Sequence, residues 1–306
     1  LAGSLESNAL SAKSRQKLSQ VAKIINYAHL EGLNVSGAYK TLIQETHKIY
    51  LLQVAFSDRL KWKKWPYVLL GSLPYRGYFS HKERNREAQK FEALGFDTFQ
   101  GEVAAFSGLG WFEDPLFYSM LERSEPFLAK LLFHELTHKS IWIAGEPEFN
   151  EHLASFVSRV LTEKYLKNVV KDQQKLQRFL AIEEDKKKYS SWIKSLRDDL
   201  KGYYESVRND PLAEVLRGKQ RIFKEYLTAK RPHFSRYDYI KGKDWNNAAV
   251  LAGLLYLPDM TSMYKYYNCS RAENFGVFFR KVKESFTQNK EAKEAMMSLC
   301  SVERLR

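Results

Sequence analysis

The segment His134-Glu135-Leu136-Thr137-His138 places two histidines four positions apart, with a glutamate directly after the first. Residues i and i+4 of a helix share one face, so the two imidazoles can bind one metal ion. Glu135 is then positioned to hold a zinc-bound water without binding the metal itself. Chance gives roughly 0.01 such matches in a chain of this composition, and the pattern is one associated with zinc peptidases. The alternative is a pair of histidines held by hydrogen bonds in a buried helix.

The residues around this motif recur at the spacing of an amphipathic helix. Its apolar positions are Phe127, Leu128, Leu131, Leu132, Leu136 and Ile141. A helical setting is what the metal hypothesis requires, because a helix places both histidines on one face and one turn apart, close enough to bind one ion.

A catalytic zinc ion usually has three protein ligands, and the third is expected downstream. Gly145 and Pro147 end one helix and begin the next, so a short connection folds the second helix back antiparallel to the first. Glu151 and His152 fall in its first turns and are about 100° apart around the axis, so only one can face the ion. We favour Glu151, because the small residue Ala154 follows and allows the helices to approach closely; His152 is the other candidate.

The rest of the chain must position these helices. Residues 11–31 are predicted to be an amphipathic helix, 49–56 a buried strand and 81–95 a charged helix ending at Gly95. Further strands are expected within 65–79 and from residue 97, and nearly everything after Ser124 is helical in pattern. We therefore expect a predominantly α-helical α+β fold, with a small mixed sheet packed on the active-site helix pair. The expected division is an α/β part, residues 1–123, and a helical part, residues 124–306, that carries the zinc site.

The strand that begins at residue 97 is a candidate substrate platform, since an exposed strand edge can pair with an extended peptide. Gly108 and Gly110 would let the peptide backbone approach closely, although an ordinary strand and tight turn explain them equally well. Glu113 and Asp114 would hold the α-ammonium group of a substrate trimmed at its amino end. The same two acids also suit a plain loop before a helix.

Tyr237 and Tyr239 are candidates for the second donor that a developing oxyanion needs. The alternative for each is aromatic packing or a surface position.

Composition limits the classes of partner. The chain has 49 lysines and arginines against 36 acids, a net charge of +13. Nucleic-acid binding is not expected, because basic residues between 164 and 231 are mixed with acids at helical spacing and no binding motif accompanies them. No run of about 18 apolar residues exists, so no transmembrane segment is expected. Cys269 and Cys300 could pair in an oxidising compartment or remain free thiols.

Five stretches resemble one family, the putative bacterial zinc aminopeptidases, which carry the gluzincin pattern of HExxH followed by an Asn-Glu pair on the next helix. They are PYRGYF at 74–79, VAAFSGLGWFEDPL at 103–116, LLFHELTHKSIW at 131–142, FNEHLASFV at 149–157 and WNNAAVLAGLLYLPDM at 245–260.

The resemblance implies one Zn²⁺ held by His134, His138 and Glu151, with Glu135 as general base, and a peptide as substrate. It also implies the bacterial periplasm or cell envelope. Members often begin with a lipoprotein leader, and a chain that starts at Leu1 is consistent with a removed leader and peripheral membrane association; a cytoplasmic location is the alternative.

Three functions remain in competition. The first is a zinc aminopeptidase, which removes residues from the amino end of peptides. A zinc endopeptidase acting on envelope peptides is the second, and a non-catalytic peptide-binding protein that keeps the fold is the third. Metal content separates the third from the other two, and N-blocked peptides separate the first from the second.

Overall fold

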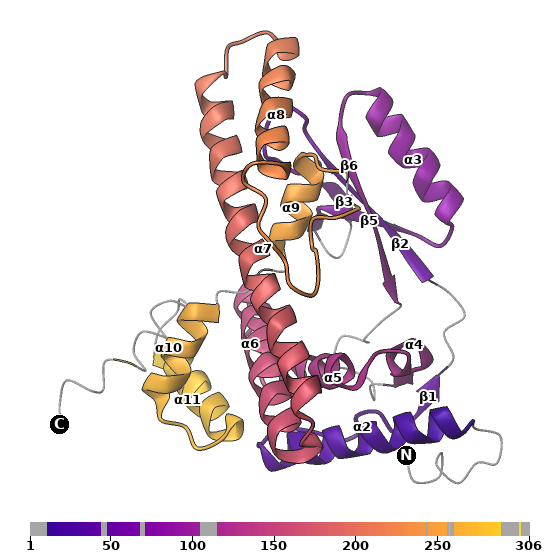
Figure 1. Ribbon diagram of the computed structural model, residues 1–306, viewed down its shortest axis with the longest axis vertical. Helices are drawn as coiled ribbons and strands as arrows, with labels where there is room; N and C mark the ends of the chain where they lie inside the picture. The colour runs from indigo at the N-terminus through magenta and orange to yellow at the C-terminus, as the bar shows by residue number, and fades with distance from the viewer. Residues whose placement is uncertain are drawn as a thin grey trace. The chain divides into compact units, whose positions relative to one another are not determined.

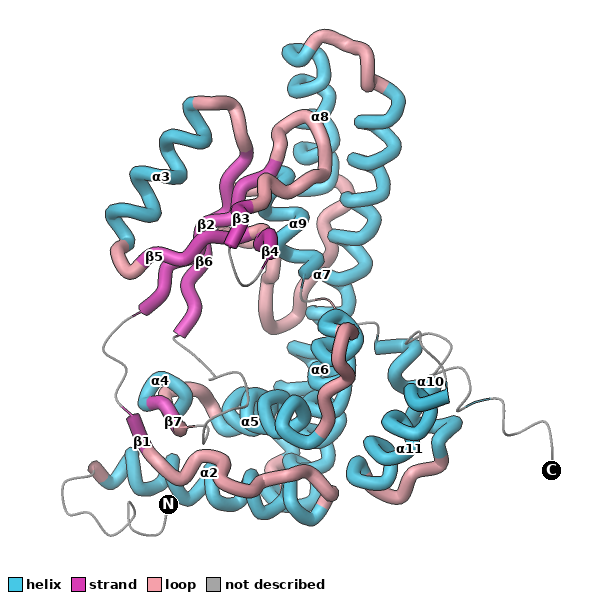
Figure 2. Tube along the Cα trace, turned by 180° about the vertical axis from the view of Figure 1, so that it is seen from behind, coloured by secondary structure: helices cyan, strands magenta, loops and turns pink. Residues whose placement is uncertain are grey.

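The computed structural model describes residues 11–43, 48–67, 71–104, 115–242, 244–255, 257, 260–288 and 300 (Figures 1 and 2). The chain divides into two compact units. Unit 1 consists of residues 1–45, 107–179 and 258–306, and unit 2 of residues 46–106 and 180–257. The division expected at residue 124 separates strand-bearing from helical sequence, whereas each compact unit draws on both.

The described residues of unit 1 are mostly helical and include one short pair of strands. Its elements are α2 (Ala12–Leu30), β1 (Leu42–Ile43), β7 (Leu116–Phe117), α4 (Tyr118–Leu121), α5 (Glu125–Ser140), α6 (Pro147–Tyr165), the π-helix η1 (Leu166–Val170), α10 (Met260–Ser270) and α11 (Phe275–Gln288). Strands β1 and β7 pair in parallel. Helix α5 packs against α6 and α2, and α10 packs against α6.

Helix α2 confirms the amphipathic helix expected at residues 11–31. It begins after Ser11, whose hydroxyl accepts a hydrogen bond from the backbone N–H of Ser14 and so satisfies one unpaired donor of the first turn. Leu18, Val21 and Ile24 are fully buried at helical spacing. Their burial is the main stabilising contribution of this helix, at about 1.5–3 kcal/mol for each side chain.

A disulfide between Cys269 and Cys300 links the end of α10 to the end of the chain. The sequence left their pairing open; the structure pairs them.

Unit 2 contains a three-stranded antiparallel sheet in the order β5-β2-β6 and a separate two-stranded pair, β3-β4. Its elements are β2 (Lys48–Ala55), β3 (Trp65–Tyr67), β4 (Gly71–Leu73), β5 (Tyr75–Tyr78), α3 (His81–Ala93), β6 (Asp97–Ala104), α8 (Leu212–Leu227), α9 (Asn247–Leu255) and most of α7 (Gln173–Ser206). Within the described part of the chain, β6 is an edge strand that pairs with β2 alone.

The sheet of unit 2 is covered on both faces. Helix α3 packs on one face and α9 contacts β2 and β6 from the other side (Figure 1). Leu52, Val54 and Ala88 are fully buried between sheet and α3, surrounded by partly buried aromatic side chains. This double covering explains the continuous apolar run of β2.

The remainder of unit 2 is a helical hairpin of α7 and α8. Its core is formed by Trp192, Leu196, Leu200, Phe223 and further buried side chains. The two helices approach closely where Gly218 faces Tyr203: a Cβ at this glycine would lie 1.9 Å from the tyrosine hydroxyl oxygen. A larger residue here would force the Tyr203 ring to move away from the carbonyls of Glu214 and Val215, to which its hydroxyl donates.

A buried carboxylate holds the loop after the hairpin. The side chain of Asp185 is fully buried and accepts hydrogen bonds from the backbone N–H groups of Ser235, Arg236 and Tyr237 at 2.6–3.0 Å. Burial alone would raise the pKa of Asp185, but these hydrogen bonds outweigh it and lower the pKa to about 2.

The expected class, a predominantly α-helical α+β fold, is confirmed. Helices α2 and α3 and strands β2 and β6 lie where the patterns predicted them, and helices dominate the described residues after Ser124. In that described part of the chain, no helix has both the length and the apolar character needed to cross a membrane.

Candidate metal centre

Helix α5 carries the first two candidate ligands, and its sequence explains why it forms here. Pro126 lies in the first turn, where its missing N–H costs no hydrogen bond. Leu128, Leu132, Phe133 and Leu136 are buried along one side of the helix. The polar positions His134 and His138 are only partly buried, with side-chain exposures of 23% and 19%.

The connection between α5 and α6 is fixed by one buried amide. Asn150, which is 1% exposed, accepts a hydrogen bond from the backbone N–H of Ile143 at 2.9 Å and donates one to its carbonyl at 2.8 Å. Gly145, with a φ of 83°, supplies the left-handed conformation needed in this short turn. The reciprocal pair of hydrogen bonds orients the first turn of α6, which carries Glu151.

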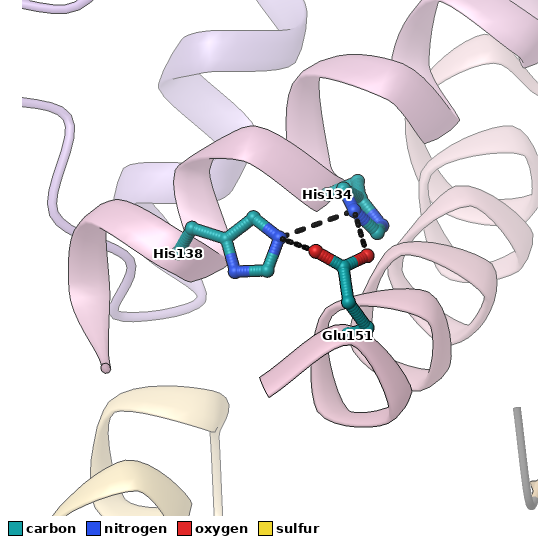
Figure 3. A group of neighbouring side chains, drawn as sticks. All are labelled: His134, His138 and Glu151. Atoms are coloured by element: carbon teal, nitrogen blue, oxygen red, sulfur yellow. Dashed lines mark hydrogen bonds and ion pairs between the residues drawn. The ribbon is translucent and has the colours of Figure 1, made fainter. Parts of the chain in front are cut away.

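Three side chains converge where the helices face each other. Figure 3 shows the Glu151 carboxylate pointing from α6 toward the two imidazoles on α5. The His134 and His138 Nε2 atoms are 3.2 Å apart. Glu151 Oε2 lies 3.4 Å from His134 Nε2, and Oε1 lies 3.3 Å from His138 Nε2. We call these three residues the triad.

The spacing of the triad suits one tetrahedral zinc ion. Two ligand atoms each about 2.05 Å from zinc, at a tetrahedral angle of about 109°, are roughly 3.3 Å apart. The separation of the two imidazole nitrogens, 3.2 Å, is close to this value, and each nitrogen lies 3.3–3.4 Å from one of the two Glu151 oxygens. Two imidazole nitrogens and one carboxylate oxygen are also the donor set typical of a catalytic zinc site with an open fourth position. The residues present therefore fit a zinc ion.

The hydrogen bonding of the triad depends on which nitrogen of each imidazole carries the proton. If both Nε2 atoms donate to the carboxylate, two N–H groups face each other at 3.2 Å. A cation between the three atoms removes that conflict.

The electrostatics of the triad favour an ionised carboxylate. Hydrogen bonds from His134 and His138 hold the pKa of Glu151 well below its ordinary value, and partial burial opposes them only in part. A carboxylate must be deprotonated to bind a metal, and the lowered pKa keeps Glu151 in that form. The Nδ1 atom of His138 is buried and has no hydrogen-bond partner among the described residues.

The structure places Glu135 next to His134 on α5 and leaves it half-buried. His152, the alternative third ligand, is half-buried on α6 and does not belong to the cluster of converging ligand atoms. The choice of Glu151 over His152 thus agrees with the geometry of the helix pair.

The structure does not test the four predicted substrate-binding residues. Gly108, Gly110, Glu113 and Asp114 lie outside the described residues. The strand expected to precede them is β6, whose outer edge has no partner strand among the described residues.

Tyr237 and Tyr239 belong to unit 2, whereas the triad belongs to unit 1. Tyr237 is 56% exposed, and its backbone N–H holds Asp185. The ring of Tyr239 stacks on Tyr189 at 5.3 Å, an arrangement that packing alone explains.

Two residues near the triad were not assigned a role from the sequence. Asn150 fixes the turn before Glu151. The sequence feature that could have indicated this role is the Asn-Glu pair near the start of the second helix. Trp142 lies two residues beyond α5, with its ring centre 5.6 Å from that of His138. Nothing in the sequence distinguishes it from the other tryptophans.

Comparison with models of protein families gives a match over residues 1–297, to the family described as "Putative aminopeptidase". The matched range contains the whole of α5 and α6 and all three residues of the triad. Comparison with curated proteins and with solved structures gives no match.

Proposed function

The chain belongs to the putative aminopeptidase family, and on this premise we propose that it is a zinc-dependent aminopeptidase. Family membership indicates peptide hydrolysis. Our proposal adds the metal and the roles of individual residues: His134, His138 and Glu151 bind one zinc ion, and Glu135 is the general base.

The observation that carries the proposal is the convergence of three side chains on adjacent helices: the two imidazole Nε2 atoms lie 3.2 Å apart, and each lies 3.3–3.4 Å from one oxygen of the Glu151 carboxylate. The packing of α5 against α6 does not require these three residues, because other side chains form the buried faces of the two helices. The triad side chains remain partly exposed, so water and substrate can reach them.

When bound, zinc would lower the pKa of a water molecule toward neutrality and polarise the scissile carbonyl. Glu135 would accept the proton of the attacking water and deliver it to the leaving amine. Asn150 would hold the α6 turn so that the Glu151 carboxylate stays aligned with the imidazoles. Tyr237 and Tyr239 remain candidates for stabilising the oxyanion.

Replacement of Glu135 tests this assignment. We expect Glu135→Gln to retain bound zinc and the fold but to lose hydrolysis by several orders of magnitude, since an amide cannot accept the proton. Zinc is measured by atomic spectroscopy, the fold by circular dichroism and hydrolysis with a panel of short peptides. Glu122→Gln, an exposed change in the same unit, is the matched control. Full activity of Glu135→Gln would refute the mechanism, and a purified wild type without zinc would favour the non-catalytic peptide-binding alternative.

Removal of amino-terminal residues is tested with paired peptides. An aminopeptidase cleaves a free peptide but not its N-acetylated form, whereas an endopeptidase cleaves both. If Glu113 and Asp114 hold the α-ammonium group, their double replacement by Gln and Asn lowers kcat/KM on free peptides by roughly 10- to 150-fold. Cleavage of acetylated peptides by wild type would leave the zinc peptidase but overturn the aminopeptidase assignment.

We propose that the protein acts in the bacterial periplasm or cell envelope. The disulfide Cys269–Cys300 supports an oxidising compartment, because such bonds are rare in the cytosol. Cell fractionation with thiol labelling tests this: a protein found in the cytosol with both thiols free would contradict it.

A further inference from the structure

Trp142 combines two properties that rarely occur together. It is a large apolar residue with 57% of its surface exposed. It also lies against the triad, with its indole ring 5.6 Å from the His138 ring at an angle of 65°. An exposed aromatic side chain is unremarkable on its own, but one beside converging metal ligands lies where a substrate must pass.

The chain direction explains this position. Helix α5 ends at Ser140, and Ile141 leaves it in an extended conformation and is buried. The next residue, Trp142, is therefore anchored between a buried isoleucine and the turn that Asn150 holds through Ile143. An indole on a fixed backbone loses little freedom when a ligand packs on it.

We propose that Trp142 determines substrate specificity, by forming an apolar subsite for a side chain next to the scissile bond. This inference rests on the proposed function. The indole packs on the ring of His138, and more than half of the Trp142 surface is exposed. A peptide residue whose backbone lies at the triad brings its side chain within reach of that surface. The preferred side chain is large and apolar, leucine or phenylalanine rather than glycine.

The size of the preference follows from the area that can be covered. Contact with the exposed indole buries roughly 60 Å² of apolar surface, which corresponds to about tenfold in kcat/KM or Kd. Charged side chains gain nothing from this surface.

The first experiment measures hydrolysis of two peptide series, Xaa-Ala-Ala and Ala-Xaa-Ala, with Xaa as Gly, Ala, Leu or Phe. Wild type should prefer Phe over Gly by about tenfold in one series. Trp142→Ala should reduce this ratio to less than about twofold, and Trp142→Phe should keep most of it. Val169→Ala, an exposed change in η1, should leave the ratio unaltered.

The second experiment measures binding without turnover. Zinc-loaded Glu135→Gln protein, with and without Trp142→Ala, is titrated with the Phe and Gly peptides by calorimetry. We expect the tenfold difference in Kd to disappear when Trp142 is replaced, with zinc content unchanged. A Phe preference in binding without any hydrolysis by wild type would remove the proposed function and leave the subsite standing.

Three results would overturn the inference. If Trp142→Ala weakens the binding of Gly and Phe peptides equally, Trp142 only positions His138. Loss of zinc from that variant would show the same. A wild type with no preference in either series, or no peptide binding at all, would exclude the subsite.

Discussion

Removal of Glu151, the proposed third ligand, offers the most direct test of the proposed zinc site. Glu151→Ala deletes the carboxylate whose oxygens lie 3.3 and 3.4 Å from the two imidazole nitrogens. His152→Ala is the matched control, because it changes the neighbouring residue of the same helix turn and leaves the triad intact.

The expected loss of zinc affinity can be estimated. The apparent free energy of zinc binding to four-ligand sites is about 10–16 kcal/mol, which divided equally gives about 2.5–4 kcal/mol for each ligand. Loss of one ligand should therefore raise Kd roughly 60- to 700-fold. Without zinc the substitution should change stability by less than about 1 kcal/mol, since the Glu151 side chain is 48% exposed and solvent screens its ion pairs.

Thermal unfolding with and without zinc measures both effects. Zinc at 100 times the wild-type Kd stabilises the folded state by about 2.7 kcal/mol. For a domain of about 150–250 residues this raises Tm by roughly 5–11 °C. At the same zinc concentration Glu151→Ala should gain less than about 0.6 kcal/mol, a shift below about 2.5 °C. His152→Ala should shift as wild type does.

The opposite pattern would refute the reasoning. If His152→Ala abolishes the zinc shift and Glu151→Ala keeps it, the third ligand is His152 and the helix pair has another register. If neither variant changes the shift, zinc stabilises the protein from a site other than the triad.

Three further predictions concern the scaffold. Asn150→Ala should lower the free energy of unfolding by about 2–3 kcal/mol in urea titrations and weaken zinc binding, since it leaves the backbone N–H and carbonyl of Ile143 unpaired; unchanged zinc affinity would show that the turn does not position the triad. Reduction of the disulfide Cys269–Cys300, whose cysteines are 31 positions apart, should lower the free energy of unfolding by about 3.7 kcal/mol, because the unfolded chain gains loop entropy. Dithiothreitol should therefore lower the Tm of wild type but not that of a variant with both cysteines replaced by serine. Asp185 has a folded pKa of about 2, below its ordinary value of 3.8, so its contribution is present above pH 3.8 and is lost as pH falls through about 2. After allowance for solvent screening, wild type should lose on the order of 1–2 kcal/mol between pH 4 and 2 through this group, and Asp185→Asn should lack that loss.

The convergence of the triad was predictable because it depends on local geometry. The spacing of His134 and His138 fixes them on one helix face whatever the rest of the fold does. Gly145 and Pro147 predict the turn between the two helices, and this turn brings Glu151 back toward the two histidines. Ligand types and short-range geometry together define the triad.

The features that escaped prediction depend on contacts distant in sequence. Strand β1 pairs with β7 more than 70 positions away, and no local pattern encodes that partner. The disulfide was undecidable, because sequence separation says nothing about whether two Cβ atoms can meet. Trp142 was overlooked for the same reason: its exposure beside His138 is a property of the packed helices.

The interleaving of the two units dictates an order of events during synthesis. Ser140, at the end of α5, accepts hydrogen bonds from Asn34 and from Lys283, 106 and 143 positions away. Phe149, at the start of α6, packs on Phe286 of α11 with ring centres 5.1 Å apart. Contacts of such separation form late, after the intervening chain has emerged and folded. A chain emerging during synthesis therefore carries all three residues of the triad before it holds the α11 contacts that support the end of α5 and the start of α6, so the triad reaches its final geometry only once the C-terminal helices have docked.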